Sequence, residues 1–232
     1  MSYFSNNIQF LRKKSGLTPD ELSSKIDVPV DTINMLEKSK LEPSVRLLIK
    51  YSGFFNYSID HLVRKDIAEN MKIAQKFDFK LLILDVDGVM TDGGMYYTES
   101  GDEFKKFNAK DGLALLRLSE ANKKTGIISS GHNVKIIETR AKHLGISFVH
   151  VGTWDKPEIL KKWCKDLDIN LSQVAFIADD LNDLPLIEKV GLSACPSDAA
   201  EKVKSAVNVI LSKKGGEGCV REFVEEYLID IN

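Results

Sequence analysis

The residues best suited to chemistry are two aspartates that follow an apolar run in the middle of the chain. Residues 81–84 are apolar, and Asp85 and Asp87 come directly after them, followed by Gly88. Side chains two positions apart lie on the same side of a strand, so these two carboxylates converge where the predicted strand ends. Neighbouring buried carboxylates repel each other, and a divalent cation with a preference for oxygen ligands, such as Mg²⁺, offsets that repulsion. The alternative is a strand end with two solvated acids.

Polar residues follow other predicted strands as well. Asp179 and Asp180 come after a second apolar run, Ser130 ends a third, and Lys156 stands just before a predicted helix start. The carboxyl ends of parallel strands share one edge of a sheet, where ligands bind. We therefore expect these side chains to lie near Asp85.

The order of an acid pair, a hydroxyl, a lysine and a second acid pair resembles the four motifs of the haloacid dehalogenase superfamily, most of whose members are phosphatases. The resemblance extends over about residues 79–228. It implies that Asp85 is a nucleophile that forms an aspartyl-phosphate. It also implies that Asp87 protonates the leaving alcohol and then activates water.

The resemblance further implies Mg²⁺ as cofactor, held by Asp85, the backbone carbonyl of Asp87 and Asp179. Ser130 is then expected to donate a hydrogen bond to the phosphoryl group, and Lys156 to neutralise charge on the nucleophile and the phosphate. Phosphoryl transfer needs such groups because its catalysis consists mainly of positioning and charge neutralisation. The alternatives are that Ser130 only caps a helix and that Lys156 is a solvated lysine.

A second set of residues is expected around this centre. Asp180 or Asp183 would hold metal-bound water or orient Lys156. Lys105 and Lys110 follow a predicted hairpin and are candidates to meet a carboxylate of the substrate. The other residues expected to contact substrate are Gly88, Gly131 and His132. The alternative for His132 is that it only begins a helix.

Residues 79–232 alternate predicted strands and helices, which indicates a parallel sheet with helices on both faces. The predicted strands are 79–85, 125–130, 148–151, 174–178, 192–194 and 207–211. The predicted helices are 110–122, 133–144, 157–167, 182–190, 199–205 and 220–228. The expected fold class is α/β: a Rossmann-like sheet of the haloacid dehalogenase type, without a cap domain, with an inserted β-hairpin and a small all-α N-terminal domain.

Residues 93–108 break the alternation and predict two strands around the turn at 99–102. The gaps from Asp85 to Ser130 and from Ser130 to Lys156 are too short for a cap domain once the core helices are placed. A phosphatase without a cap must close its active site in another way. We expect a neighbouring subunit to cover the site.

The hairpin, residues 107–112 and the glycine-rich residues 215–222 resemble the 3-deoxy-manno-octulosonate 8-phosphate phosphatases, a group that includes enzymes for nine-carbon ulosonate 9-phosphates. That resemblance implies a phosphorylated sugar acid as substrate and a homotetramer in which the hairpins pack together. The chain departs from the group at His132, where an arginine is usual, and at Glu217, where an arginine is also usual. Glu217 has the wrong charge to bind a sugar acid, so both substrate lengths stay open.

Residues 1–66 have helical periodicity throughout and form a predicted separate domain, joined by a linker at 67–78 to the domain at 79–232. The predicted helices are 7–15, 19–26, 30–37, 44–54 and 58–63, with a capping box at 18–21. Their order resembles the Cro/repressor-type helix-turn-helix fold.

Binding of this domain to DNA is possible but doubtful. The expected recognition helix offers only Asn34 for base readout, and Asp31 would repel phosphate. Basic residues barely outnumber acidic ones over residues 1–66, which is a weak footprint for nucleic acid. The alternative is a helical module for interaction or oligomerisation.

Composition limits the remaining classes. The chain has 232 residues and a formal net charge of −2, so no global attraction to nucleic acid or to acidic membranes is expected. No apolar run is long enough for a transmembrane helix, and residues 1–6 lack the pattern of a signal peptide. Cys164, Cys195 and Cys219 show no metal-ligand spacing and are expected to be reduced thiols in a cytoplasmic protein.

Two functional classes follow. One is a phosphatase with an ancillary helical domain, and the other is a regulator whose phosphatase-like domain only senses a ligand. Asp85, Asp87, Lys156 and Asp179 together favour the phosphatase, because a sensor need not keep a nucleophile, an acid and a metal ligand.

Overall fold

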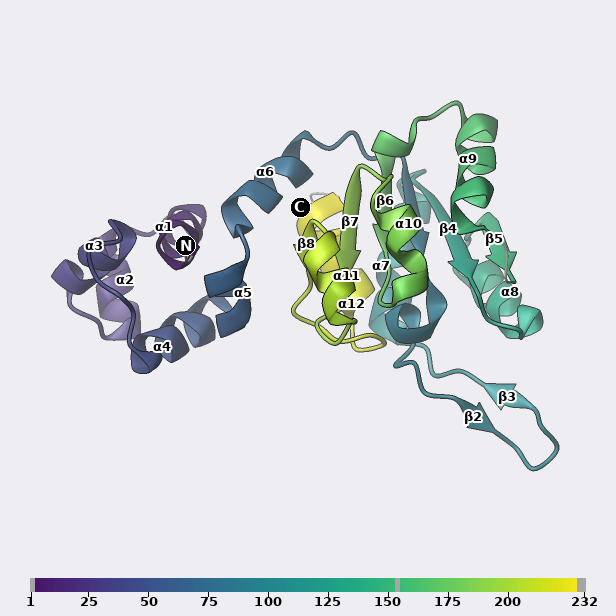
Figure 1. Cartoon of the computed structure of the whole chain (residues 1–232), viewed down its shortest axis with the longest axis horizontal. Helices are drawn as coiled ribbons and strands as arrows, with labels where there is room; N and C mark the ends of the chain where they lie inside the picture. The colour runs from purple at the N-terminus through teal and green to yellow at the C-terminus, as the bar shows by residue number, and fades with distance from the viewer. Residues whose placement is uncertain (1–2, 153–154, 229–232) are drawn as a thin grey trace. The chain divides into compact units, whose positions relative to one another are not determined.

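The computed structural model describes residues 3–152 and 155–228 (Figure 1). Contacts divide the chain between residues 73 and 74 into two compact units. The division falls within helix α6 (Ile67–Lys76), in the segment expected to be a linker. Each unit has its own core.

The N-terminal unit is helical, as the periodicity predicted. Its helices are α1 (Phe4–Lys14), α2 (Pro19–Ile26), α3 (Val30–Glu37), α4 (Val45–Phe55), α5 (Ile59–Arg64) and the start of α6. The expected capping box is present, since Thr18 and Glu21 bond each other's backbone N–H groups. Ser44 and Ser58 cap α4 and α5 in the same position.

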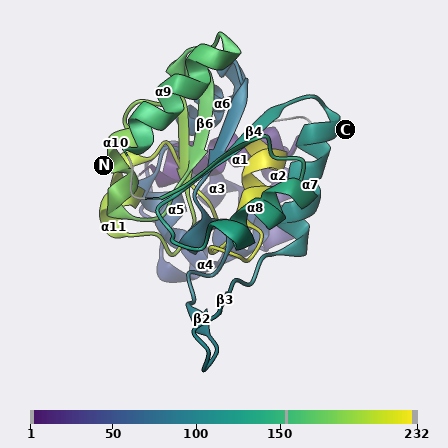
Figure 2. The ribbon, with the colours of Figure 1, turned by 90° about the vertical axis from the view of Figure 1, so that its right-hand side faces the viewer.

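The C-terminal unit is built on a parallel sheet with the strand order β5-β4-β1-β6-β7-β8. The strands are β1 (Leu81–Leu84), β4 (Lys124–Ser129), β5 (Phe148–Val151), β6 (Val174–Ile177), β7 (Leu192–Cys195) and β8 (Val209–Ile210). Figure 2 shows helices on both faces of this sheet. On one face lie α9 (Lys156–Leu167), α10 (Leu184–Ile187) and α11 (Glu201–Ala206), and on the other lie α7 (Ala109–Glu120) and α8 (Val134–His143). Helix α12 (Cys219–Phe223) packs on α7. The α/β class is confirmed.

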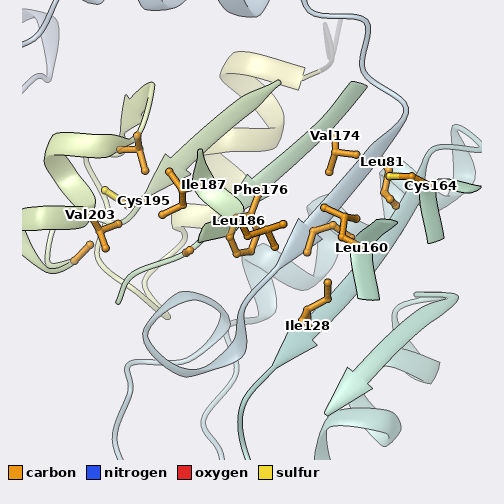
Figure 3. Close-up of a cluster of buried hydrophobic side chains, with 14 residues drawn as sticks. Leu81, Ile128, Leu160, Cys164, Val174, Phe176, Leu186, Ile187, Cys195 and Val203 are labelled. Carbon is orange, nitrogen blue, oxygen red and sulfur yellow. The ribbon is translucent and has the colours of Figure 1, made fainter. Parts of the chain in front are cut away.

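The central strands are buried throughout because helices cover both faces. Leu81 and Phe176 pack with Leu160 of α9 and Leu186 of α10 in one apolar cluster (Figure 3). All four side chains are fully buried. Burial of each such side chain stabilises the fold by roughly 1.5–3 kcal/mol, which makes the sheet a rigid support for the residues at its carboxyl edge.

Two predicted helices are wrong in detail. The helix expected at 182–190 is a 3₁₀ turn (Leu181–Asp183) followed by the short α10, and Pro185 explains the break because it lacks a backbone N–H. The helix expected at 220–228 is α12 followed by a π-helical turn (Val224–Leu228). The strand expected at 207–211 is shorter, because α11 runs to Ala206.

The hairpin consists of β2 (Tyr96–Tyr97) and β3 (Glu103–Phe104), which pair antiparallel. It projects from the sheet domain (Figure 1). Its apolar side chains are exposed: Met95 by 56%, Tyr97 by 60% and Phe104 by 54%. Within the described residues, no helix has the length and apolarity needed to cross a bilayer.

Candidate active site

Asp85 lies at the carboxyl end of β1 and is 7% exposed. Its Oδ1 accepts a hydrogen bond of 2.7 Å from the backbone N–H of Val86. The chain then turns through Asp87 and Gly88, and Gly88 has a φ of +77°. A Cβ on Gly88 would lie 2.0 Å from Oδ2 of Asp179. A glycine is therefore required where these two strand ends meet.

Lys156 joins the acids at the centre of this edge. It begins α9 and is 5% exposed, and its Nζ donates to Oδ2 of Asp85 at 3.1 Å and to Oδ1 of Asp183 at 2.6 Å. Burial lowers the pKa of Lys156, but the charges and hydrogen bonds of Asp85 and Asp183 outweigh it and leave that pKa raised. The ammonium group therefore stays charged inside the site. The hydrogen bond from Lys156 fits one of the two roles expected for Asp183, the orientation of Lys156, and that role stays a prediction.

Three carboxylates form a candidate metal centre. One oxygen each from Asp85, Asp179 and Asp183 lies within 4.8 Å of the others. Burial, followed by the charges of Asp85 and Asp180, raises the pKa of Asp179 to about 7. Burial and the charge of Asp85 also raise the pKa of Asp183.

This donor set fits a divalent cation. Oδ2 of Asp183 is buried and has no hydrogen-bond partner among the described residues. Three neighbouring carboxylates, one of them with an unbonded buried oxygen, are costly to bury with only the single positive charge of Lys156. A bound cation would offset that cost. All three ligands are oxygens, which suits Mg²⁺.

The hydroxyl segment follows the neighbouring strand β4. Ser130 is half-buried, and its Oγ accepts a hydrogen bond of 3.3 Å from Nδ2 of Asn182. The backbone N–H of Gly131 donates to Oγ of Ser129 at 3.2 Å. A Cβ on Gly131 would lie 3.6 Å from Oδ2 of Asp87, so the segment reaches the acid pair. Asn133, and not Ser130, caps α8.

A cleft of about 550 Å³ opens beside Asp87. The hairpin contributes Met95, Tyr97, Glu103 and Lys105 to its walls. The loop before α8 contributes His132, and the first turn of α8 contributes Lys135. This size suits a sugar-sized leaving group. His132 is exposed there, as a substrate contact would be.

Inside the cleft, Asp87 is paired with Lys105. The Nζ of Lys105 donates to Oδ1 of Asp87 at 2.5 Å and contacts Oε1 of Glu103 at 2.8 Å. No motif in the sequence indicated a role for Glu103. The pattern that could have indicated one is the alternation of side chains over residues 103–105, which begins in β3 and places Glu103 and Lys105 on one side and Phe104 on the other.

Other residues named from the sequence lie elsewhere. Lys110 is exposed in the first turn of α7 and does not line the cleft. Asp180 is exposed and caps the 3₁₀ turn through Leu181. Glu217 is exposed near Lys106, whose pKa is raised first by its hydrogen bond to Asp92 and only slightly by Glu217.

The glycine-rich tail packs on the loop after β1. The backbone N–H of Gly216 donates to the carbonyl of Val89 at 2.9 Å, and Nδ2 of Asn108 donates to the carbonyl of Gly216 at 2.8 Å. A Cβ on Gly215 would lie 2.0 Å from the carbonyl oxygen of Gly88. The tail therefore fixes the loop that carries Asp87.

Known protein families match both parts of the chain. The haloacid dehalogenase-like hydrolase family matches residues 48–223, and a helix-turn-helix family matches residues 8–62. The chain therefore belongs to the haloacid dehalogenase-like hydrolase family and carries a helix-turn-helix domain at its N-terminal end. Both predicted resemblances are confirmed.

Individual relatives are sugar-acid phosphatases. The 3-deoxy-D-manno-octulosonate 8-phosphate phosphatase KdsC of Yersinia pestis is 37% identical over 157 residues, which cover 68% of this chain and 83% of that protein. The Escherichia coli K12 enzyme of the same name is 36% identical with the same coverage. The Moraxella catarrhalis phosphatase, solved with magnesium ion, phosphate ion and KDO, is 35% identical, with a TM-score of 0.65 over 68% of this chain and 90% of that one. This chain is accordingly an enzyme, a phosphoric monoester hydrolase.

Proposed function

We propose that this chain is a Mg²⁺-dependent phosphatase of sugar-acid phosphates and that its substrate is 3-deoxy-D-manno-octulosonate 8-phosphate. The observation that carries the proposal is the convergence of Asp85, Lys156 and Asp183, all buried, beside Asp179 at one edge of the sheet. Burial of such a cluster of charges costs desolvation free energy, so we infer that the cluster serves a function. It supplies a nucleophile, a fixed cation and metal ligands together.

In the proposed reaction, a carboxylate oxygen of Asp85 attacks phosphorus and the bond from phosphorus to the ester oxygen breaks. Asp87 gives its proton to the leaving alcohol. A water molecule then attacks the phosphorus of the aspartyl-phosphate and passes a proton to Asp87. This attack releases phosphate and restores the carboxylate of Asp85. Lys156 holds the Asp85 carboxylate in place through both steps, and Ser130 donates a hydrogen bond to the phosphoryl oxygens.

Asp85, Asp179 and Asp183 are the side chains that would hold Mg²⁺, with the backbone carbonyl of Asp87 as the further ligand suggested by the family pattern. The cation supplies charge neutralisation for the phosphoryl oxygens. Asp183 also binds Lys156 through Oδ1, so its Oδ2, which has no hydrogen-bond partner in the described part of the chain, is the oxygen that would serve the metal through water.

Two substrate lengths are supported by different features. The relatives named above are eight-carbon enzymes, which supports the octulosonate. His132 lines the cleft at a position where an arginine is usual, which keeps a nine-carbon ulosonate 9-phosphate as the second candidate. Glu217 is exposed on the tail near Lys106, so we expect it to have little part in this choice.

The N-terminal domain raises the second functional class, a regulator that senses a ligand. The helix-turn-helix match supports it. The side chains of α3 do not support it. Asp31, which would repel phosphate, is exposed there, and Asn34, the residue expected to read bases, is half-buried. We propose that the domain is an interaction or oligomerisation module, and that the catalytic domain assembles as a homotetramer through its exposed hairpin.

The test is a phosphate-release assay on the full chain with Mg²⁺. The substrates are 3-deoxy-D-manno-octulosonate 8-phosphate, N-acetylneuraminate 9-phosphate and glucose 6-phosphate. We expect hydrolysis of an acidic sugar phosphate that is abolished by EDTA and by Asp85→Asn. The matched control is Asp166→Asn, the same change at an exposed position of α9, which should leave the rate unchanged. Release of phosphate by Asp85→Asn at the wild-type rate would overturn the assignment.

A further inference from the structure

We propose that Glu103 and Lys105 form a positioning pair that aims the carboxyl group of Asp87 at the leaving oxygen of the substrate. The pair lies on the hairpin, outside the four motifs that carry the reaction. The inference rests on the proposed phosphatase chemistry, in which Asp87 is the acid that protonates the leaving alcohol.

The pair is buried although it lies on a projecting hairpin. The side chain of Lys105 is 2% exposed and that of Glu103 is 11% exposed, whereas that of Asp87 is 35% exposed. Lys105 therefore bridges the nearly buried carboxylate of Glu103 and the more exposed carboxylate of Asp87, both of which line the cleft. The two N···O distances, 2.8 Å to Glu103 and 2.5 Å to Asp87, are those of charge-assisted hydrogen bonds.

The alternation of the strand separates this pair from its neighbours. Phe104 and Lys106 point away from it: Phe104 is 54% exposed, and the side chain of Lys106 is 66% exposed and pairs with Asp92 at 3.0 Å. A lysine so far removed from water is tolerated only when it is paired. Burial by itself lowers the pKa of Lys105, but its bonds to Asp87 and Glu103 leave that pKa raised, so the cation persists.

Asp87 needs such support because of where it lies. It follows the rigid strand β1 but precedes Gly88, so its backbone is not fixed by the sheet. Within the described parts of the chain, Lys105 is the one side chain that hydrogen-bonds its carboxylate. A misplacement of about 1 Å in a reacting group reduces rates by on the order of a hundredfold. Glu103 in turn fixes Lys105, so the hairpin sets the direction of the acid.

Leaving-group dependence separates positioning of the acid from a general structural role. The separate values of kcat and KM for the sugar-acid phosphate distinguish positioning, which lowers kcat, from binding of the substrate carboxylate by Lys105, whose loss would raise KM and leave kcat unchanged. A sugar alkoxide needs a proton as it leaves, whereas p-nitrophenolate leaves without one. The parameter kcat/KM covers the steps up to transfer of the phosphoryl group and so excludes the later hydrolysis of the aspartyl-phosphate. Both substrates are to be measured with the full chain and Mg²⁺.

For Lys105→Met we expect kcat/KM for 3-deoxy-D-manno-octulosonate 8-phosphate to fall on the order of a hundredfold, within the range of general acid catalysis. For p-nitrophenyl phosphate we expect a fall of less than about fivefold. Lys105→Arg should recover part of the loss. Lys106→Met is the matched control, because it removes the neighbouring exposed lysine, and both substrates should react as with wild type.

Equal losses for the two substrates would overturn the inference, and so would no loss for either. If Lys105→Met does not fold, Glu103→Gln replaces it, because this change keeps the shape of the pair. Its losses of kcat/KM for the two substrates are then compared in the same way. Wild-type protein that releases phosphate from neither substrate would overturn the proposed function itself. That failure is seen before any variant is made, so the two failures are distinguishable.

Discussion

Removal of the Lys156 charge should destabilise the chain strongly. Lys156→Met keeps most of the volume of the side chain but leaves Asp85 and Asp183 as buried, unpaired carboxylates. Breaking a buried ion pair on one side costs about 3–5 kcal/mol. Lys156 has two carboxylate partners at 2.6 and 3.1 Å, and Asp183 is fully buried, so the upper part of that range applies. For a chain of this length the melting temperature falls about 2–4 °C per kcal/mol, so a cost of about 4–5 kcal/mol lowers it by about 8 °C or more.

Differential scanning calorimetry in EDTA measures this loss in the transition of the catalytic domain. Lys161→Met is the matched control on the same helix, because Lys161 is exposed and its bond to Glu158 lies at the surface. We expect it to change stability by less than about 0.5 kcal/mol. Addition of Asp183→Asn to Lys156→Met should recover part of the stability, because it removes one of the two stranded charges and keeps the shape. Mg²⁺ should also recover part of it.

Two results would refute this reasoning. A melting temperature of Lys156→Met equal to that of Lys161→Met would mean that the buried ion pairs do not hold the site together. A double variant no more stable than Lys156→Met would mean that the buried, unpaired charge of Asp183 is not a cause of the loss.

Three shorter predictions follow from the same site. Gly88→Ala should abolish Mg²⁺ binding and turnover, because its Cβ would lie 2.0 Å from Oδ2 of Asp179. The control Gly101→Ala has a similar positive φ of +86° but open space around it, and it should keep both. Isothermal titration calorimetry measures Mg²⁺ binding by the two variants. Protons compete with the metal at Asp179, whose pKa is raised to about 7 in the absence of metal, so its protonated form prevails below that pH. The apparent affinity for Mg²⁺ should thus be roughly tenfold weaker at pH 6 than at pH 8, and equal affinities would contradict the assignment. Tyr97→Glu on the exposed hairpin should dissociate the expected tetramer in light scattering, whereas Glu99→Gln in the nearby turn should not, and a wild-type monomer at micromolar concentration would exclude the assembly.

The sheet and the meeting of its polar ends were predictable because they depend on local pattern and on one topological rule. Residues 81–84 and 174–177 are apolar runs that end in acids, and parallel strands place such ends at one edge. The strand order β4-β1-β6 then makes Asp85 the centre, between Ser130 and Asp179. The roles of these residues in catalysis stay predictions.

The position of the hairpin was not predictable in the same way. Its strands β2 and β3 have two residues each, so local pattern indicated their presence but not their direction relative to the sheet. The contact of Lys105 with Asp87 depends on that direction. Lys110 was assigned to the substrate site from its place in the segment alone, and the start of α7 places it outside the residues that line the cleft.

Direct detection of the phosphorylated residue tests the central claim most directly. Asp87→Asn should slow hydrolysis of the aspartyl-phosphate and allow it to accumulate after mixing with substrate and Mg²⁺. Borohydride reduction converts a phosphorylated aspartate to homoserine, which peptide mass spectrometry locates. The account predicts homoserine at residue 85 and none in Asp85→Asn/Asp87→Asn. Turnover with no acyl-phosphate, or homoserine at another aspartate, would contradict it.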